Sequence, residues 1–189
     1  MNTKPFENYS IITRLLFRLM HPFMSVVMES PLRRKLNDPV RTLKGAGIQS
    51  GQQVLEVGCG TGYFTISAAK LVGDEGLIHA IDIYPPSIEC VAKKVEDAHV
   101  TNVKVTNADA MDNGLPGNSF DLVLLFGVLP APVLTLDRLL LEMHRVLKQG
   151  GGLAIWSMVP FWSTSPVARS KLFKYRGKEN GVHNFIKVS

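Results

Sequence analysis

The segment VLEVGCGTGYF, residues 54–64, decides the fold of this chain. Its first four residues form a short, mostly apolar run, which is typical of a buried strand. Glycines follow at positions 58, 60 and 62, and the pattern after them indicates a helix over 63–71 that Gly73 closes. A strand that leads through glycines into a helix lets the backbone approach a ligand closely and offers it free N–H groups. The segment therefore predicts a ligand-binding turn.

The same alternation of strand and helix patterns continues along the chain. After the first strand, further strands are expected at 77–83, 103–105, 120–126 and 153–158, with helices at 86–98 and 134–147 between them. A final helix is expected at 166–173, and an antiparallel C-terminal hairpin from 174–176 and 183–188. Strands that alternate with helices predict a parallel sheet, and strands that are apolar on both sides predict helices on both faces. The fold class is therefore α/β, a Rossmann-like three-layer sandwich with a mainly parallel sheet.

The N-terminal 45 residues are expected to form a helical lid or arm that precedes a ligand-binding domain at 46–189. Residues 1–8 are polar and expected to be flexible. Residues 9–29 predict an amphipathic helix, because apolar side chains recur at three- and four-residue spacing, and Pro22 should kink it. A second short helix is expected over 38–45, with a proline in its first turn.

The composition is that of a globular protein. Of the 189 residues, 46% are hydrophobic and 20% are charged, which argues against disorder and provides enough chain for one core. Two cysteines, Cys59 and Cys90, give neither a disulfide framework nor zinc-site spacing, so no metal site is predicted and a cytoplasmic location is expected. The apolar stretch 11–28 is interrupted by Arg14 and Arg18, which argues against a transmembrane span.

The charge is unevenly distributed. Residues 1–45 carry eight Lys or Arg against three Asp or Glu, and residues 169–189 carry six against one. Such basic ends can meet anionic lipid, nucleic acid or an acidic substrate, or they can be solvated surface. No base-flipping signature supports a nucleic-acid partner. For residues 9–35 the alternatives are a lid over the pocket and peripheral contact with a membrane surface.

The spacing of the glycines separates the ligand classes. A dinucleotide-binding turn has the pattern G-x-G-x-x-G, which here would need glycine where Tyr63 stands. A phosphate-binding P-loop is excluded, because no Gly-Lys-Ser/Thr follows. Glu56 lies two residues before the first glycine, where it would oppose a pyrophosphate and suit a cationic ligand.

Two further acidic residues follow the next strands. Asp82 ends the second strand, twenty residues after Gly62, where a carboxylate can accept hydrogen bonds from both ribose hydroxyls, and Ile83 could pack on an adenine. Asp109 follows the third strand, where it could accept from the adenine amino group, with the Ala110 backbone beside it. The alternatives are a helix-capping role for Asp82 and a turn-forming role for Asp109.

Together these segments resemble the class I S-adenosylmethionine-dependent methyltransferases. The resemblance covers about residues 40–160 and is carried, in order, by VLEVGCGTGYFT (54–65), HAIDIYPPSIE (79–89), NADA (107–110), FDLVLLFGVL (120–129) and LLLEMHRVLKQGGGLAIW (139–156). The nearest group in character is the broad small-molecule one, of methyltransferase type 11, which includes quinone and sterol methyltransferases.

The resemblance implies S-adenosylmethionine as the cofactor and assigns roles to the matching positions. Glu56 and the glycine turn would hold the methionine portion, Asp82 the ribose and Asp109 the adenine. Carbonyl groups near Phe126 would face the methionine ammonium. The complete set of expected cofactor-binding residues is Glu56, Gly58, Cys59, Gly60, Gly62, Tyr63, Asp82, Ile83, Asp109, Ala110 and Phe126.

The expected reaction is in-line methyl transfer to a small, apolar or lipid-like acceptor. Because the sulfonium already activates the methyl group, positioning can supply most of the catalysis. A base is needed only for a protonated acceptor, and His21 is the candidate that the sequence offers. About thirty residues follow the fifth expected strand, which is short for a helix and two closing strands. The alternative is therefore a catalytically silent S-adenosylmethionine-binding module or a subunit of a larger complex.

Overall fold

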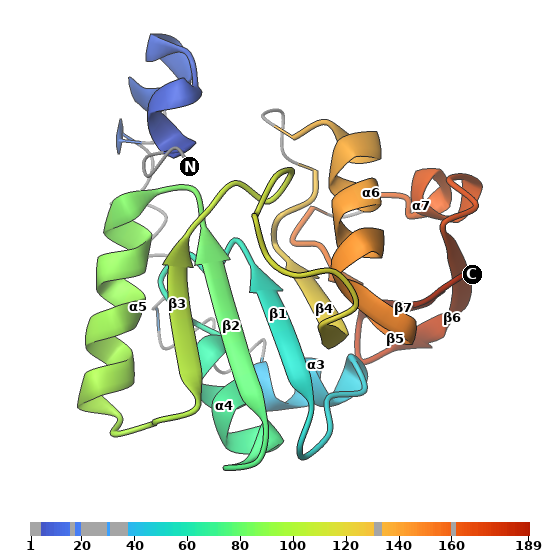
Figure 1. The fold of residues 1–189 in the computed structure, drawn as a ribbon, viewed down its shortest axis with the longest axis horizontal. Coiled ribbons are helices and arrows are strands. Elements are labelled where there is room, and N and C mark those ends of the chain that lie inside the picture. Colours follow the sequence, from blue (N-terminus) through green and yellow to red (C-terminus); the bar gives the residue numbers. More distant parts are fainter. Residues whose placement is uncertain (1–4, 16–17, 20–29, 31–37, 131–133, 160–161) are drawn as a thin grey trace.

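The computed structural model describes residues 5–15, 18–19, 30, 38–130, 134–159 and 162–189. They build a seven-stranded sheet with the order β3-β2-β1-β4-β5-β7-β6 (Figure 1). Its strands are β1 (Gln53–Val57), β2 (Leu77–Asp82), β3 (Val103–Asn107), β4 (Phe120–Phe126), β5 (Leu147–Trp156), β6 (Phe173–Glu179) and β7 (Val182–Lys187). Strands β1 to β5 pair in parallel, whereas β7 is antiparallel to both β5 and β6. The expected α/β sandwich with a mainly parallel sheet is confirmed.

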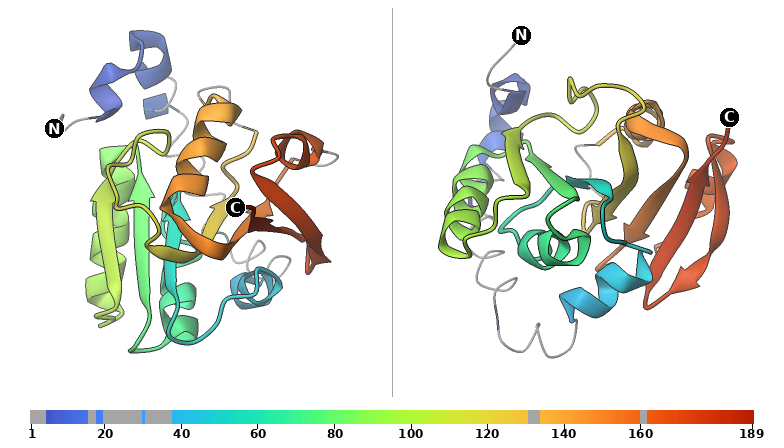
Figure 2. Two further views of the ribbon diagram at one scale, coloured as in Figure 1. Left: turned by 45° about the vertical axis from the view of Figure 1, so that its right-hand side comes forward. Right: turned by 60° about the horizontal axis from the view of Figure 1, so that its bottom comes forward.

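Helices cover both faces of the sheet (Figure 2). The named α-helices are α3 (Pro39–Gly45), α4 (Thr65–Val72), α5 (Pro85–Asp97), α6 (Leu136–Val146) and α7 (Ser165–Arg169), and the 3₁₀ helix η1 (Pro5–Asn8) belongs to the N-terminal segment. The expected short helix after position 38 is confirmed as α3, where the Asp38 carboxylate accepts a hydrogen bond from the Val40 N–H (2.9 Å). The expected helix over 63–71 begins two residues later, at Thr65.

The side chains of β1 alternate between the two faces of the sheet. Leu55 and Val57 belong to the core that includes Leu140 of α6, whereas Val54 belongs to the core that includes Ala68 of α4. The period of two is that of a strand between two layers of helices. Because Glu56 has the same parity as Val54, its side chain points toward α4.

The fifth strand begins earlier than the sequence pattern predicted. The expected helix over 134–147 ends at Val146, and β5 starts at Leu147, not at Leu153. Leu147 is fully buried and pairs with Phe120, so it extends the strand instead of the helix. The glycines that were expected to stop the helix lie in a register shift of β5, which includes Gly150 at φ +73°.

The C-terminal hairpin is confirmed, and it is longer than expected. The expectation that the tail is too short for a helix and two strands is wrong, because α7 takes only five residues. The expected helix over 166–173 is correspondingly reduced, and Phe173 begins β6. Strand β7 lies between β5 and β6 in the sheet, and its residue Phe185 packs into the hydrophobic core.

The N-terminal segment also differs from the sequence prediction. Residues 5–8 form η1 and bury Phe6, so the expected flexible polar start is wrong for them. Residues 11–15 and 18–19 are helical, as predicted, and Pro22 lies outside the described residues. Figure 1 places this segment beyond the carboxyl ends of β2 and β3. Within the described part of the chain, no helix is long and apolar enough to cross a membrane.

Candidate cofactor site

A cavity of about 210 Å³ lies where the parallel strands end. Its wall is formed by the carboxyl ends of β1, β2 and β4, the turn after β3, and the N-terminal segment. The residues that line it are Tyr9, Val57, Gly58, Ile81, Asp82, Ile83, Ala108, Asp109, Ala110, Gly127, Val128 and Leu134. In an open parallel sheet, ligands bind at this edge, at the point where the strand order reverses. Here β2 and β4 flank β1, so the cavity lies at the reversal.

The glycine turn after β1 is folded against the end of β2. Gly58, Gly60 and Gly62 all have positive φ, between +54° and +77°. The N–H groups of Gly58 and Cys59 both donate to the Ile81 carbonyl, at 2.8 and 3.1 Å. A Cβ on Gly58 would lie 2.8 Å from Cγ2 of Val128 in the cavity wall. The absence of a side chain at this position is therefore a steric requirement of the site.

Asp82 connects the glycine turn to the start of α5. Its side chain is 9% exposed, and Oδ2 accepts a hydrogen bond from the Gly60 N–H (2.8 Å). Oδ1 accepts from the Tyr84 N–H (2.9 Å). The side-chain amide of Asn107, at the end of β3, holds the backbone of the same turn, because it donates hydrogen bonds to the carbonyls of Asp82 and Ile83, both at 2.9 Å. Charge-assisted bonds of this kind fix a carboxylate in the cavity wall.

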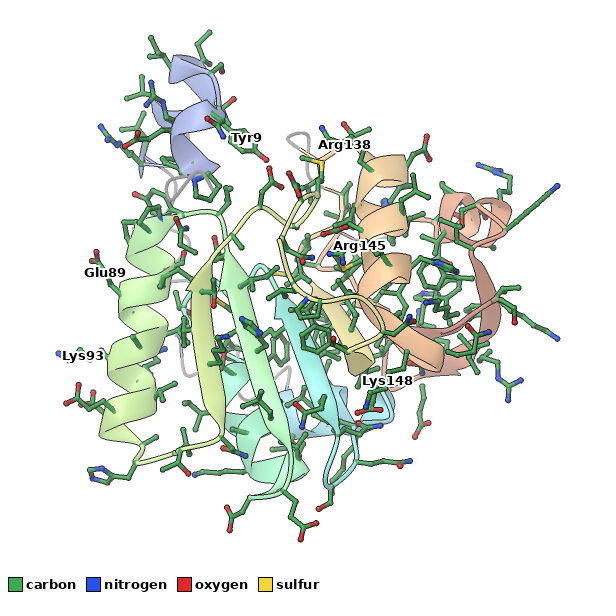
Figure 3. All side chains as sticks on the ribbon, viewed as in Figure 1. Tyr9, Glu89, Lys93, Arg138, Arg145 and Lys148 are labelled. Atoms are coloured by element: carbon green, nitrogen blue, oxygen red, sulfur yellow. The ribbon has the colours of Figure 1, made fainter. Side chains whose placement is uncertain are left out.

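Asp109 is held at the other side of the cavity. Its Oδ1 accepts a hydrogen bond from the Met111 N–H (2.8 Å), which is the turn-forming role considered as the alternative. Its Oδ2 accepts from the hydroxyl of Tyr9 (3.3 Å), one hundred residues earlier in the chain. Figure 3 shows the Tyr9 side chain extending from the N-terminal segment at this edge of the molecule. The carboxylate therefore both orders its turn and faces the cavity.

Glu56 is buried behind the glycine turn. Its Oε2 accepts a hydrogen bond from the Thr65 hydroxyl (2.6 Å), and its side chain is only 3% exposed. Burial, and to a smaller extent the negative charge of Asp82, raise the pKa of Glu56 to about 7, although the bond from Thr65 opposes this. Two carboxylates in one apolar region favour a cationic partner, because its charge would offset their mutual repulsion.

The structure brings part of the expected residue set to the cavity. Five expected residues line it, namely Gly58, Asp82, Ile83, Asp109 and Ala110. The other six are not among the residues that line it. Cys59 is buried beside Val91 of α5, and burial raises the pKa of its thiol. Tyr63 and Phe126 are buried in the core on the α4 side, where both belong to one cluster with Phe64.

Other cavity residues were not anticipated from the sequence. Tyr9 is the main one, and the available signal was its spacing of three from Phe6, which puts two aromatic rings on one side of a helical turn. Val128 and Leu134 flank the loop after β4. His21, the candidate base, lies outside the described residues.

An open parallel sheet with a glycine turn after β1 and carboxylates after β2 and β3 defines a Rossmann-like protein that binds a nucleoside-containing ligand. Residues 48–180 match the family model described as a methyltransferase domain. The chain belongs to this methyltransferase family.

Relatives with assigned names resemble the chain over its middle part. It is 35% identical over 120 residues to a demethylmenaquinone methyltransferase of Geobacillus sp. (strain WCH70), covering 63% of this chain and 50% of that protein. It is 38% identical over 114 residues to the protein of the same name from Listeria welshimeri, covering 60% and 48%. The chain therefore spans about half the length of the curated relatives it matches.

Solved structures extend the similarity to most of the chain. A SAM dependent methyltransferase from Aquifex aeolicus superposes with a TM-score of 0.73 at 25% identity, covering 88% of this chain and 97% of that one. The [4+2]-cyclase SpnF superposes with a TM-score of 0.67 at 21% identity, covering 86% and 72%. The second likeness concerns the fold alone, and the name of that protein shows that this fold also carries other chemistry.

Proposed function

We propose that this chain is an S-adenosylmethionine-dependent methyltransferase that acts on a small, apolar or lipid-like acceptor. The observation that carries the proposal is the cavity at the carboxyl edge of the sheet, with Asp82 and Asp109 in its wall, in a chain of the methyltransferase family. The relatives named demethylmenaquinone methyltransferase support an acceptor of quinone type.

The residues in the cavity wall fit the chemical groups of this cofactor. Asp82 is positioned for the ribose hydroxyls, and Asp109 for the adenine amino group, because ionised carboxylates accept hydrogen bonds from both. Ile83 offers an apolar surface between them. The buried carboxylate of Glu56 suits the positive charge of the methionine portion, which the glycine turn would approach without side chains.

The protein's part in this reaction is mainly positioning. The bound cofactor supplies a methyl group that its sulfonium already activates. Rigid strand ends and apolar residues such as Val128 and Leu134 would exclude water and hold the acceptor in line with the methyl group. A base is required only if the acceptor atom carries a proton, and His21 remains the proposed candidate.

Calorimetric titration with S-adenosylmethionine, with NAD as the comparison ligand, tests the proposal. We expect the wild-type protein to bind S-adenosylmethionine and not NAD. Asp82→Ala should weaken binding by about tenfold or more, because it removes a charged acceptor. Asp97→Ala, which changes an exposed residue at the end of α5, is the matched control and should bind normally.

Turnover separates the enzyme from the catalytically silent module. Demethylated quinols and other apolar phenols should be methylated by the wild-type protein and not by Asp82→Ala. Failure of the wild-type protein to bind the cofactor would contradict the proposal as a whole. Tight binding without methylation of any acceptor in the panel would favour the silent module.

We further propose that residues 9–35 make peripheral contact with an anionic membrane surface, from which a lipid-like acceptor could enter the site. The support comes from four exposed apolar residues of the described helical part: Ile11 (75% exposed), Ile12 (80%), Leu15 (55%) and Leu19 (69%). At 3.6 residues per turn the three positions within residues 11–15 fall within an arc of about 100°.

The charges around this arc suit anionic lipid. Arg14, in the helical residues 11–15, is half-buried, and Arg18, in the helical residues 18–19, is exposed. No Asp or Glu occurs between Glu7 and Glu29. An apolar stripe beside arginines is the pattern of an interfacial helix. The helical part follows Tyr9 directly in the chain, so a membrane bound here would lie beside the cavity.

Sedimentation with phosphatidylglycerol vesicles tests the membrane contact. The protein should co-sediment with these vesicles and much less with phosphatidylcholine vesicles. Leu15→Glu should weaken co-sedimentation, whereas Leu141→Glu, which alters an equally exposed leucine (58%) on α6, should not. Equal effects of the two changes, or no binding to either kind of vesicle, would contradict the contact.

A further inference from the structure

Residues 5–9 pack against the two turns that carry the carboxylates of the site. The ring of Phe6 lies edge-on to Tyr84, with 5.1 Å between the centroids, and the Phe6 side chain is only 7% exposed. Tyr84 in turn donates its N–H to Asp82. Tyr9, three residues beyond Phe6, reaches the other turn through Asp109. The segment is therefore part of the wall of the cavity and bridges its two acidic turns.

The hydrogen bond between Tyr9 and Asp109 has a defined direction. Burial and the charge of Asp109 raise the pKa of Tyr9 to about 12, so its hydroxyl stays protonated at neutral pH. An ionised carboxylate only accepts hydrogen bonds, so the hydroxyl must be the donor. With the Met111 N–H on the other oxygen, both oxygens of Asp109 are held, one from its own turn and one from the N-terminal segment.

We propose that Tyr9 is a specificity-determining residue that holds Asp109 in the orientation that selects an adenine base. The inference rests on the proposed function, in which Asp109 accepts a hydrogen bond from the adenine amino group. A base with a 6-oxo group, such as hypoxanthine, presents an acceptor where adenine presents a donor. Facing a fixed carboxylate, that acceptor is rejected, because neither group can donate.

The orientation of the carboxylate decides how strong this rejection is. Once the Tyr9 hydroxyl is removed, only the Met111 N–H is left of the two described bonds to the carboxylate, which can then turn away from a 6-oxo group. Tyr9→Phe removes this one bond and keeps the ring in the cavity wall. The variant therefore tests whether Tyr9 acts by orienting Asp109 through its hydroxyl or only by filling the cavity wall with its ring.

The experiment compares the affinities of two nucleoside ligands for the wild-type protein and for two variants. Calorimetry gives the Kd of S-adenosylhomocysteine and of its 6-oxo analogue S-inosylhomocysteine for the wild-type protein, Tyr9→Phe and Tyr175→Phe. Tyr175 is the matched control, because its hydroxyl makes a hydrogen bond of the same length (3.3 Å) to His183, away from the cavity. We expect the wild-type protein and Tyr175→Phe to prefer the adenosyl ligand equally. Tyr9→Phe should reduce this preference by about tenfold, the usual effect of a hydrogen bond to a charged group.

Each outcome decides the question. Equal weakening of both ligands by Tyr9→Phe would overturn the inference and leave Tyr9 as a wall residue only. An unchanged preference with unchanged affinities would also overturn it. If the wild-type protein bound neither ligand, the proposed function would fail and the inference with it, whereas failure of the preference test alone leaves the proposed function standing.

Discussion

The cavity edge of the sheet and its antiparallel extension are built on opposite principles. The cavity edge, at the ends of β1 and β2, contains the buried carboxylates Glu56 and Asp82 and a turn of three glycines with positive φ. The extension, made of β5, β7 and β6, buries aromatic and aliphatic side chains such as Phe173 and Phe185. One region therefore keeps charge out of water, and the other removes apolar surface from it.

This difference suggests that the residues that stabilise the fold and the residues that bind the ligand lie in different regions. Burying charge costs free energy unless it is paired, whereas burying a large apolar side chain contributes to stability. Residues of the extension should therefore govern the free energy of unfolding, and residues of the cavity edge should govern ligand affinity and its pH dependence. Substitutions in the two regions can test this separation.

Phe185→Ala should have the largest effect on stability. Phe185 is 2% exposed, pairs with Leu153 of β5 and lies edge-on to Tyr175 at 5.1 Å. Its truncation should lower the free energy of unfolding by about 4 kcal/mol, because it leaves a cavity in the core. Urea unfolding followed by circular dichroism measures the change. Val188→Ala, at an exposed position of the same end, should change stability by less than about 0.5 kcal/mol, and equal effects would contradict the comparison.

Glu56→Gln should remove a pH dependence that originates at the cavity edge. The pKa of Glu56 is raised in the folded protein from 4.5 to about 7, so the folded state binds more protons than the unfolded state between these values. Its contribution is favourable below about pH 4.5 and is lost as the pH rises to about 7, by on the order of 3 kcal/mol.

Unfolding measured from pH 5 to 7 in the wild-type protein and in Glu56→Gln checks this, because the wild-type free energy of unfolding should fall relative to that of Glu56→Gln as the pH rises. The comparison cancels the contribution of His79, whose pKa burial lowers to about 4 and whose contribution to stability rises with pH in the same window. The window avoids Asp121 and Glu142, whose pKa values are lowered by hydrogen bonds from Lys148 and Arg145, and whose contributions are lost only on acidification. Identical slopes in the two proteins would show that Glu56 does not carry a shifted pKa.

Two glycine substitutions with similar backbone angles compare the regions directly. A Cβ added to Gly58 (φ +67°), at the cavity edge, would lie 2.8 Å from Val128, whereas a Cβ added to Gly150 (φ +73°), in β5, would meet nothing within 4 Å. Gly150→Ala should cost about 1 kcal/mol from backbone strain, and Gly58→Ala about 2 kcal/mol because the clash is added. Gly58→Ala should also weaken cofactor binding. Thermal unfolding and calorimetry measure both effects, and equal costs would show that Val128 moves aside.

His144→Ala should have the smallest effect. The His144 side chain joins α6 to the residue that follows β7, through a hydrogen bond between Nε2 and the Val188 carbonyl (2.8 Å), and it lies edge-on to Phe173. Loss of this one partly exposed hydrogen bond should reduce the free energy of unfolding by about 1 kcal/mol and leave ligand affinity unchanged. A reduced affinity for S-adenosylmethionine would contradict the separation of the two regions.

Local patterns made the parallel part of the fold predictable. The expected strand over 120–126 coincides with β4, because a continuous apolar run of this length is typical of a strand that helices cover on both faces. Asp82 ends β2 and Asp109 follows β3, and these strands are neighbours in the sheet, so the convergence of the two residues on one cavity could be expected from the topology. The helices expected over 63–71, 86–98 and 134–147 are present as α4, α5 and α6, and only their first and last residues differ, by one or two positions.

Features that depend on distant contacts were not predictable in the same way. The early start of β5 depends on the pairing of Leu147 with Phe120, which no local pattern encodes. Tyr63 packs in the core on the α4 side, a placement that its position beside the glycines does not encode, and its role in cofactor binding stays a prediction. The bond between Tyr9 and Asp109 joins residues one hundred positions apart.

The placement of β7 between β5 and β6 has a consequence for the order of synthesis. The ribosome makes β6 before β7, although β6 reaches the sheet through β7. Glu179 pairs with Val182 across Asn180 and Gly181, both at positive φ, which is a tight two-residue turn suited to the twist of a hairpin. The two strands can therefore pair locally as soon as both have been made, and then join β5 together. Once this turn has closed, β7 covers one edge of nascent β6, and only the edge that also borders the finished sheet stays open to pairing with other chains.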